Sequence, residues 1–253
     1  MSFFHRLNAE TATAQARLAN HPFITGALAG NLSLEGYVAF LHQAYHHVRH
    51  TAPIFMTAGA ACSGRHEWLR KPLVEYMEEE IGHDEWILND IVACGGDREA
   101  AKASKPSQAI ELMVSFTYDV AQRLNPIGVF GMVHCLEGTS IKVATPAAEV
   151  LQEKLGLPSK AFTYLGSHGS LDLEHYEFFT GLMNQVTDKA DQEWIIHCAN
   201  TVFDLYTNMF DSLPLAVHEV AALCFATPMS CSPVPAGASV ANWCEHSRHD
   251  QPS

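Results

Sequence analysis

Basic residues are scarce in this chain. Lys and Arg number 15 against 28 Asp and Glu, which gives a net charge of −13 over 253 residues. The few cations form no dense cluster, so binding to nucleic acid or to an anionic membrane through a basic patch is excluded. Histidine is abundant by comparison, at 15 residues, and this favours metal chemistry.

Long apolar runs and paired cysteines are also missing. No run approaches the roughly 18 apolar residues of a membrane-spanning helix, and the first residues lack the apolar core of a signal peptide. The seven cysteines are odd in number and contain no C-x-x-C pair. We therefore expect a soluble cytoplasmic protein with reduced thiols, most of them packed as small apolar side chains. A nucleophilic cysteine beside a histidine is the alternative.

Strand patterns are absent as well, and the apolar residues follow helical periodicity throughout. We expect an all-α fold of roughly seven main helices, with Ser33 and Ser107 as N-caps. The expected domain covers residues 1–226, followed by an irregular tail over 227–253. The expected helices cover 3–20, 34–62 with a kink or break at Pro53, 67–94, 108–123, a helix opened by Pro126, 146–155, 159–186, 189–212 and 215–225, with a charged loop over 97–105.

Three of these helices carry ionisable residues in the middle of an apolar stripe. His168, Asp172 and His175 are spaced four and three residues apart, so they share one helix face. Glu80 and His83 interrupt a second stripe and Glu137 interrupts a third. Taken one at a time, these residues are equally consistent with a solvated turn or with a buried ion pair between Glu80 and His83.

Together the six residues favour a metal centre inside the bundle. A core accommodates so many ionisable groups only by pairing them or by binding cations, and no Lys or Arg lies on the three stripes. Carboxylates and imidazoles without thiolates favour iron or manganese over structural zinc. Six ligands exceed the needs of one ion with open positions, so two ions would share them. The residual positive charge of two ferrous ions would favour an anionic ligand, such as a substrate carboxylate.

A second histidine pattern competes with this site. His42, His46 and His50 recur every four residues, with His47 beside them. Such a ladder can bind a metal, but no carboxylate shares its face, and a solvated helix face explains it as well. We favour a substrate-lining role for His46 or His47 over ligation.

The order of the motifs resembles that of the haem-oxygenase-like di-iron oxidases, the superfamily that includes the TenA-like and PqqC-like folds. The resemblance rests on Glu80-Ile-Gly-His83 with Asp84-Glu85-Trp86, on Leu136-Glu137-Gly138, and on the segment His168 to His175. The pattern is most similar to the branch that contains the 1-alkene-forming fatty-acid decarboxylase and the chlamydial para-aminobenzoate-synthesis protein. It spans residues 33–215 in helix order.

The resemblance implies a seven-helix haem-oxygenase-like bundle without haem, commonly a homodimer. It implies two Fe(II) ions with O2 as co-substrate, and oxidative C–C cleavage, desaturation or N-oxygenation of fatty acids or amino acids. By position, Glu80 and His83 would bind one iron together with either His168 or His175. Glu137 would bridge the two irons, and Asp172 with the other of these two histidines would bind the second iron.

We therefore expect an O2-dependent di-iron oxidase acting on a small carboxylate, an amino acid or its derivative in the first place and a fatty acid in the second. Arg49, Arg65 or Lys142 would meet the substrate carboxylate. The rivals are a metal-free thiaminase-like hydrolase with Cys135 as nucleophile, a cofactorless oxidase of the same fold, a haem oxygenase with His5 or His21 as the iron ligand, and a binding module with a vestigial centre. The residues expected to line the substrate site are His46, His47, Tyr76, Phe130 and Phe179.

Overall fold

The computed structural model describes residues 1–214, except for the side chains of residues 168–174. This part of the chain contains helices and no strand, which confirms the all-α prediction. The expected helix over 215–225 and the expected tail lie outside the described residues. None of the helices described is long and apolar enough to cross a membrane. The α-helices are α1 (Phe3–Ala19), α2 (Pro22–Leu28), α3 (Leu34–Val48), α4 (Thr51–Ala61), α5 (Arg70–Glu80), α6 (His83–Ala93), α7 (Arg98–Ala103), α8 (Gln108–Asp119), α9 (Val129–Leu155), α10 (Thr163–Met183) and α11 (Lys189–Phe210).

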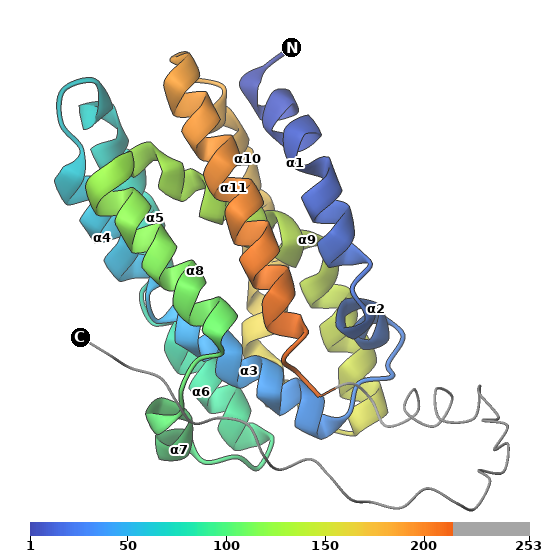
Figure 1. The fold of residues 1–253 in the computed structure, drawn as a ribbon. Coiled ribbons are helices and arrows are strands. Elements are labelled where there is room, and N and C mark those ends of the chain that lie inside the picture. The colour runs from blue at the N-terminus through green and yellow to red at the C-terminus, as the bar shows by residue number, and fades with distance from the viewer. Residues whose placement is uncertain (215–253) are drawn as a thin grey trace, which may run out of the picture.

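Helix α9 is the central element of the bundle. It packs against α10, α11 and α2, while α11 also contacts α1 and α8 (Figure 1). Gly131 permits the close approach of α9 and α11, because a Cβ atom there would lie 2.5 Å from the Ala199 amide nitrogen and 2.6 Å from the Ile195 carbonyl oxygen. A side chain at this position would therefore push the two helices apart. The middle of α9, which carries Glu137, is thus held deep in the core.

Proline acts differently at two positions. The helix expected over 34–62 is broken into α3 and α4, and Pro53 lies in the first turn of α4. A proline ring would clash with the carbonyl of residue 49, so the chain breaks there, and the missing N–H costs nothing in a first turn.

Pro146, in contrast, lies inside α9, where we expected one helix to end and another to begin. It cannot donate to the carbonyl of Lys142, yet the helix continues. Ala144, Ala147, Ala148 and Leu151 around it are buried, so packing on α9 outweighs the local cost.

Another break separates Glu80 from His83, two predicted ligands that we expected on one helix. The helix expected over 67–94 is a short 3-10 turn (Gly64–Leu69) followed by α5 and α6, with Ile81 and Gly82 between them. Gly82 has φ +93°, a left-handed conformation that glycine adopts without steric cost. Glu80 therefore ends one helix and His83 begins the next.

The segment expected as a charged loop over 97–105 contains the helix α7. The Asp97 carboxylate caps it by accepting from the Ala100 amide at 2.6 Å. Arg98 pairs with Glu85 of α6 at 2.6 Å, and Ala101 is fully buried. One capping acid and one buried alanine thus stabilise a helix too short to be recognised by periodicity. The caps expected at Ser33 and Ser107 are confirmed.

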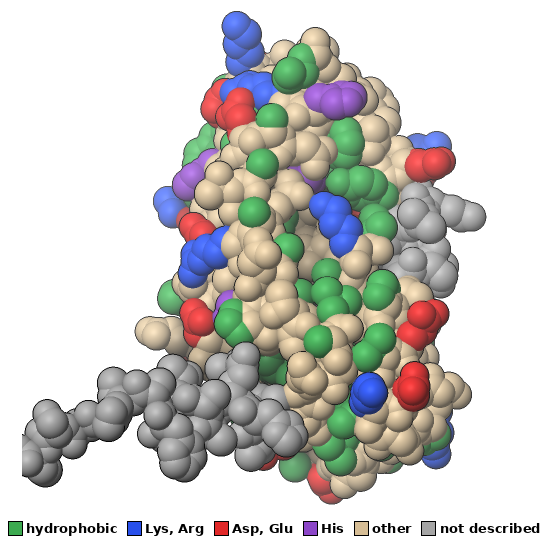
Figure 2. All heavy atoms as spheres, turned by 90° about the vertical axis from the view of Figure 1, so that its right-hand side faces the viewer, with side chains coloured by type: hydrophobic (Ala, Val, Ile, Leu, Met, Phe, Trp, Pro, Cys, Tyr) green, Lys and Arg blue, Asp and Glu red, His purple; other side chains and the backbone are tan. Residues whose placement is uncertain are grey.

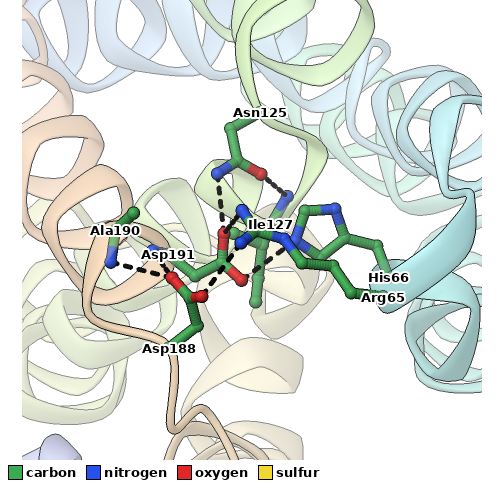
Figure 3. A network of polar contacts seen from close by, with 7 residues as sticks. All are labelled: Arg65, His66, Asn125, Ile127, Asp188, Ala190 and Asp191. Carbon is green, nitrogen blue, oxygen red and sulfur yellow. Dashed lines mark hydrogen bonds and ion pairs between the residues drawn. The ribbon is translucent and has the colours of Figure 1, made fainter.

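A buried carboxylate joins three separate parts of the bundle. The Asp191 side chain near the start of α11 is 6 % exposed. It accepts from Arg65 Nη2 at 2.9 Å, from His66 Nε2 at 3.0 Å and from Asn125 Nδ2 at 2.9 Å (Figure 3). Arg65 also reaches Asp188, the N-cap of α11, at 2.9 Å. This group, named here the Asp191 clamp, fixes the segment before α5 and the segment before α9 to the same helix.

Candidate metal centre

Glu80 and His83 meet across the break between α5 and α6. Glu80 Oε2 lies 3.3 Å from His83 Nδ1, and the two side chains are 10 % and 4 % exposed. The imidazole of His83 stacks on the Trp86 indole, with ring centroids 4.1 Å apart. The bend at Gly82 therefore brings together an oxygen donor and a nitrogen donor that face the interior.

Glu137 lies on the middle of α9 and is 8 % exposed. It lines the same cavity as Glu80, so the two carboxylates reach one space from two different helices. Burial raises the pKa of the Tyr176 hydroxyl, and the charge of Glu137 adds to the rise, which places the tyrosine near this carboxylate. The prediction that Glu80 and Glu137 approach a common site agrees with this geometry.

The third group of predicted ligands lies on α10, which packs against both α9 and α6. His168, Asp172 and His175 all fall within this helix. The side chains of His168 and Asp172 lie outside the described residues. His175 is described: its Nε2 lies 3.1 Å from Glu79 Oε2, and its side chain is 13 % exposed.

Glu79 is a residue that the sequence did not single out. A straight helix over 67–94 would place it off the apolar stripe, with Glu78 on a solvated acidic face. Both residues are exposed, Glu79 to 44 % of its side chain, but Glu79 also contacts His175, a residue nearly a hundred positions away in the chain. Partial burial raises the pKa of Glu79, and the charge of His175 opposes that rise. Only the packing of α10 on this part of the bundle could have revealed the pair.

The donor set in this region suits a hard or borderline cation. The described side chains offer carboxylate oxygens from Glu79, Glu80 and Glu137 and imidazole nitrogens from His83 and His175, without a thiolate. Iron and manganese prefer such donors. Among the side chains described, no three His, Cys, Asp or Glu lie close enough to form a metal site by themselves. A complete site would therefore need ligands from the segment of α10 whose side chains are not described.

A cavity of about 100 Å³ adjoins the two carboxylates, and we name it the inner cavity. Of the described residues that line it, the charged ones are Glu80 and Glu137, and none is Lys or Arg. Its polar lining includes His47, Tyr164 and Tyr206. Most of the wall is apolar and consists of Ile24, Phe40, Val48, Phe55, Met132, Val133, Leu136, Val143, Ala144, Leu165 and Phe210.

The residues expected to line a substrate site do not lie together. His47 lines the inner cavity and packs edge-on against Tyr206. His46 instead faces α7, where its Nε2 lies 2.8 Å from Ser104 Oγ. Tyr76 and Phe130 pack on each other, and Phe179 stacks on the buried His134. The substrate-lining role of all five stays a prediction.

The rival histidine ladder faces away from the inner cavity. His42 and His46 both approach Ser104, and His50 Nδ1 lies 3.1 Å from the Tyr118 hydroxyl. Burial lowers the pKa of all three imidazoles, which favours their neutral form. Hydroxyl partners on α7 and α8 account for the ladder, as expected for a helix face with a packing role.

The three basic residues expected to bind a substrate carboxylate also lie in different parts of the structure. Arg65 belongs to the Asp191 clamp, and the Arg49 guanidinium lies over the Tyr45 ring at 5.4 Å. Lys142 lies on α9, one to two turns beyond Glu137, and lines a second cavity beside the inner one. Of the three, Lys142 is the cation placed near the candidate centre.

Comparison with known families identifies a sequence relationship over most of the chain. The sequence model of a family described as iron-containing redox enzymes matches residues 38–207. This range contains all six predicted ligands. No curated protein sequence matches the chain.

Solved structures share the fold at low identity. A domain of unknown function with a haem-oxygenase-like fold from Shewanella denitrificans superposes with a TM-score of 0.75 at 20 % identity, covering 92 % of this chain and 99 % of that one. A TenA homologue from Pseudomonas syringae gives 0.69 at 14 % identity, over 83 % and 91 %. Haem oxygenase-1 from the cyanobacterium Synechocystis, in complex with haem, gives 0.67 at 17 % identity, over 89 % and 98 %. The predicted haem-oxygenase-like fold is thus confirmed.

Proposed function

Because the chain belongs to the family of iron-containing redox enzymes, we propose that it is an O2-dependent oxidase with two ferrous ions bound by Glu80, His83, Glu137, His168, Asp172 and His175. The observation that carries this proposal is the meeting of Glu80 with His83 at 3.3 Å beside a buried cavity that Glu137 also lines. When bound, the two ions would supply electrons to dioxygen.

The chain's own residues would position the ions and the substrate. The bend at Gly82 brings His83 to Glu80, which lines the cavity, and α9 presents Glu137 to the same cavity. The lining of the inner cavity is largely apolar, so a substrate that displaces water from it would strengthen the electrostatic interactions there. Glu79, paired with His175, would hold that imidazole in one orientation, as outer carboxylates do for histidine ligands.

The proposed substrate is a small carboxylate. An amino acid or its derivative is one candidate, and oxidative cleavage, desaturation or N-oxygenation are the candidate reactions. The second candidate is a fatty acid, and the apolar wall of the inner cavity favours it, because an alkyl chain gains free energy by leaving water for such a wall. Homodimer formation is part of this proposal and stays a prediction.

The thiaminase-like and haem-oxygenase rivals have weaker support. Cys135 is fully buried, and burial raises the pKa of its thiol, which disfavours the thiolate that a hydrolase would need as nucleophile. For a haem oxygenase, His21 is a poor iron ligand, since its Nδ1 accepts from the Phe23 amide at 3.1 Å and its Nε2 lies 3.1 Å from Asp211. His5 is turned toward Ser2 at the surface.

Anaerobic loading with ferrous iron tests the proposal directly. We expect about two irons per chain by metal analysis, and less than one in a His175→Ala variant, because each ion in such a site needs its full protein ligand set. The loaded protein should then consume oxygen, followed with an electrode, faster with at least one member of a panel of amino acids and fatty acids. Less than one iron per wild-type chain would refute the site. Two irons without substrate-dependent oxygen consumption would favour a binding module with a vestigial centre.

A further inference from the structure

A second cavity of about 240 Å³ lies beside the inner cavity, and we name it the outer cavity. Three side chains line both spaces and so form the wall between them: Ile24 of α2 and Thr139 and Val143 of α9. Figure 2 looks onto the side of the molecule that carries α2 and the middle of α9, and it shows a hollow there with a Lys or Arg side chain at its edge. The outer cavity thus shares a wall with the cavity of the candidate centre.

The two cavities differ in charge. Lys142 is the charged residue among those described that line the outer cavity, whereas Glu80 and Glu137 are the charged residues of the inner one. Lys142 follows Glu137 by five residues on α9, which separates them by about 7–8 Å along the helix axis. The backbone positions of the two charged residues are therefore separated along α9 by no more than the length of a short alkyl chain.

The ammonium group of Lys142 is positioned by a hydrogen-bonded neighbour. Its Nζ donates to Gln15 Oε1 at 3.2 Å, and the Gln15 amide in turn donates to Thr11 Oγ1 at 2.9 Å. Thr11 is fully buried and donates to the Leu7 carbonyl, so this chain of contacts is anchored in α1. An ammonium carries three N–H donors, and two remain after the contact with Gln15.

We propose that the outer cavity binds the carboxylate of the substrate through Lys142, and that the apolar body of the substrate extends past Ile24, Thr139 and Val143 into the inner cavity. This inference rests on the proposed function for the inner cavity and specifies its substrate as an alkyl-chain carboxylate bound head outward. The carbon atoms that reach Glu80 and Glu137 are then those far from the carboxylate.

Electrostatics supports this orientation over the reverse one. In the metal-free chain an incoming carboxylate is repelled by two acidic side chains in the inner cavity, and none of the described lining residues there is Lys or Arg. Bound ferrous ions would offset this repulsion, so the iron-loaded titration in the test below decides whether the carboxylate then binds at the metal instead. At the outer cavity the same carboxylate gains a charge-assisted hydrogen bond from Lys142 and keeps part of its hydration. The alkyl chain meanwhile leaves water for a largely apolar wall.

The test compares a charged and a neutral ligand of equal length. Octanoate and 1-octanol are titrated by calorimetry into the full chain, both metal-free and loaded with ferrous iron. We expect Lys142→Met to weaken the affinity for octanoate about five- to tenfold, the loss typical of a partly exposed charged hydrogen bond. The affinity for 1-octanol should change less than about twofold. Lys154→Met is the matched control, since Lys154 is exposed on the same helix and does not line the outer cavity; it should change neither ligand.

Two results would overturn the inference. One is octanoate binding that is absent, or equal in wild type and Lys142→Met. The other is octanoate affinity that depends on ferrous iron and not on Lys142, which would place the carboxylate at the metal. Failure of the proposed function would be recognised by a different result. A chain that binds no iron, yet binds octanoate in a Lys142-dependent manner, would refute the proposed oxidase activity and still support the carboxylate site in the outer cavity.

Discussion

The Asp191 clamp and the Glu80–Glu137 region both place carboxylates in the core, but with different partners. Asp191 meets an arginine, an imidazole and an amide, each at 2.9–3.0 Å. The contacts described for Glu79 and Glu80 are to imidazoles alone, beside a cavity. A carboxylate with a guanidinium partner is neutralised within the protein, whereas carboxylates grouped with imidazoles form a set of donors suited to a cation. The first arrangement stabilises the fold, and the second is suited to binding.

The largest expected effect comes from breaking the clamp. Asp191→Ala leaves Arg65, His66 and Asn125 without their common acceptor, so we expect the free energy of unfolding to fall by about 3 kcal/mol. Urea denaturation followed by circular dichroism measures this loss. Asp188→Ala, which removes an exposed helix cap and one exposed ion pair with Arg65, should lower the free energy of unfolding clearly less. Equal losses in the two variants would mean that the buried contacts of Asp191 contribute little.

A smaller but more specific effect is expected at the candidate centre. Glu137→Gln keeps the shape and one acceptor oxygen, so the metal-free protein should lose less than about 1 kcal/mol of stability. Its ferrous iron affinity, measured by competition with a chelator, should fall at least about tenfold because a charged ligand is lost. Asp191→Ala should show the opposite pattern in the same two assays. A large stability loss with unchanged iron binding in Glu137→Gln would make Glu137 a structural residue like Asp191.

The smallest effect is expected at Glu79. Glu79→Gln still accepts a hydrogen bond from His175 but without charge assistance, so iron affinity should fall about three- to tenfold. Glu78→Gln is the matched control, because Glu78 is the exposed neighbour on the same helix. Indistinguishable iron affinities in the two variants would mean that Glu79 has no role in iron binding and is part of a solvated acidic face, as the sequence suggested.

The features that could be predicted from the sequence are those that depend on local residue spacing. The all-α fold, the caps at Ser33 and Ser107, and the approach of Glu80 and Glu137 to one space follow from apolar spacing and from ionisable residues that interrupt it. Glu80 and His83 were expected on one helix, and this was wrong, because α5 ends at Glu80 and α6 begins at His83. The two side chains still meet at 3.3 Å, and their role as metal ligands stays a prediction.

Features that depend on contacts between distant segments could not be predicted from the sequence. The partners of Asp191 come from residues 65, 66 and 125, and the partner of Glu79 is residue 175. The continuity of α9 through Pro146 is decided by packing on both sides, which local propensity does not report. The position of Lys142 beside a cavity likewise required the arrangement of α1, α2 and α9.

The break at Gly82 has a consequence for finding related sites in other sequences. Because Glu80 and His83 belong to two helices, their separation along the chain is set by the connecting residues and not by the helical repeat. A chain with a longer connection between the same two helices would hold the same pair of donors, although its spacing would match no helical pattern. Searches that demand a glutamate and a histidine three residues apart would then miss relatives that conserve the site, whereas searches that allow a variable insertion at the turn would recover them.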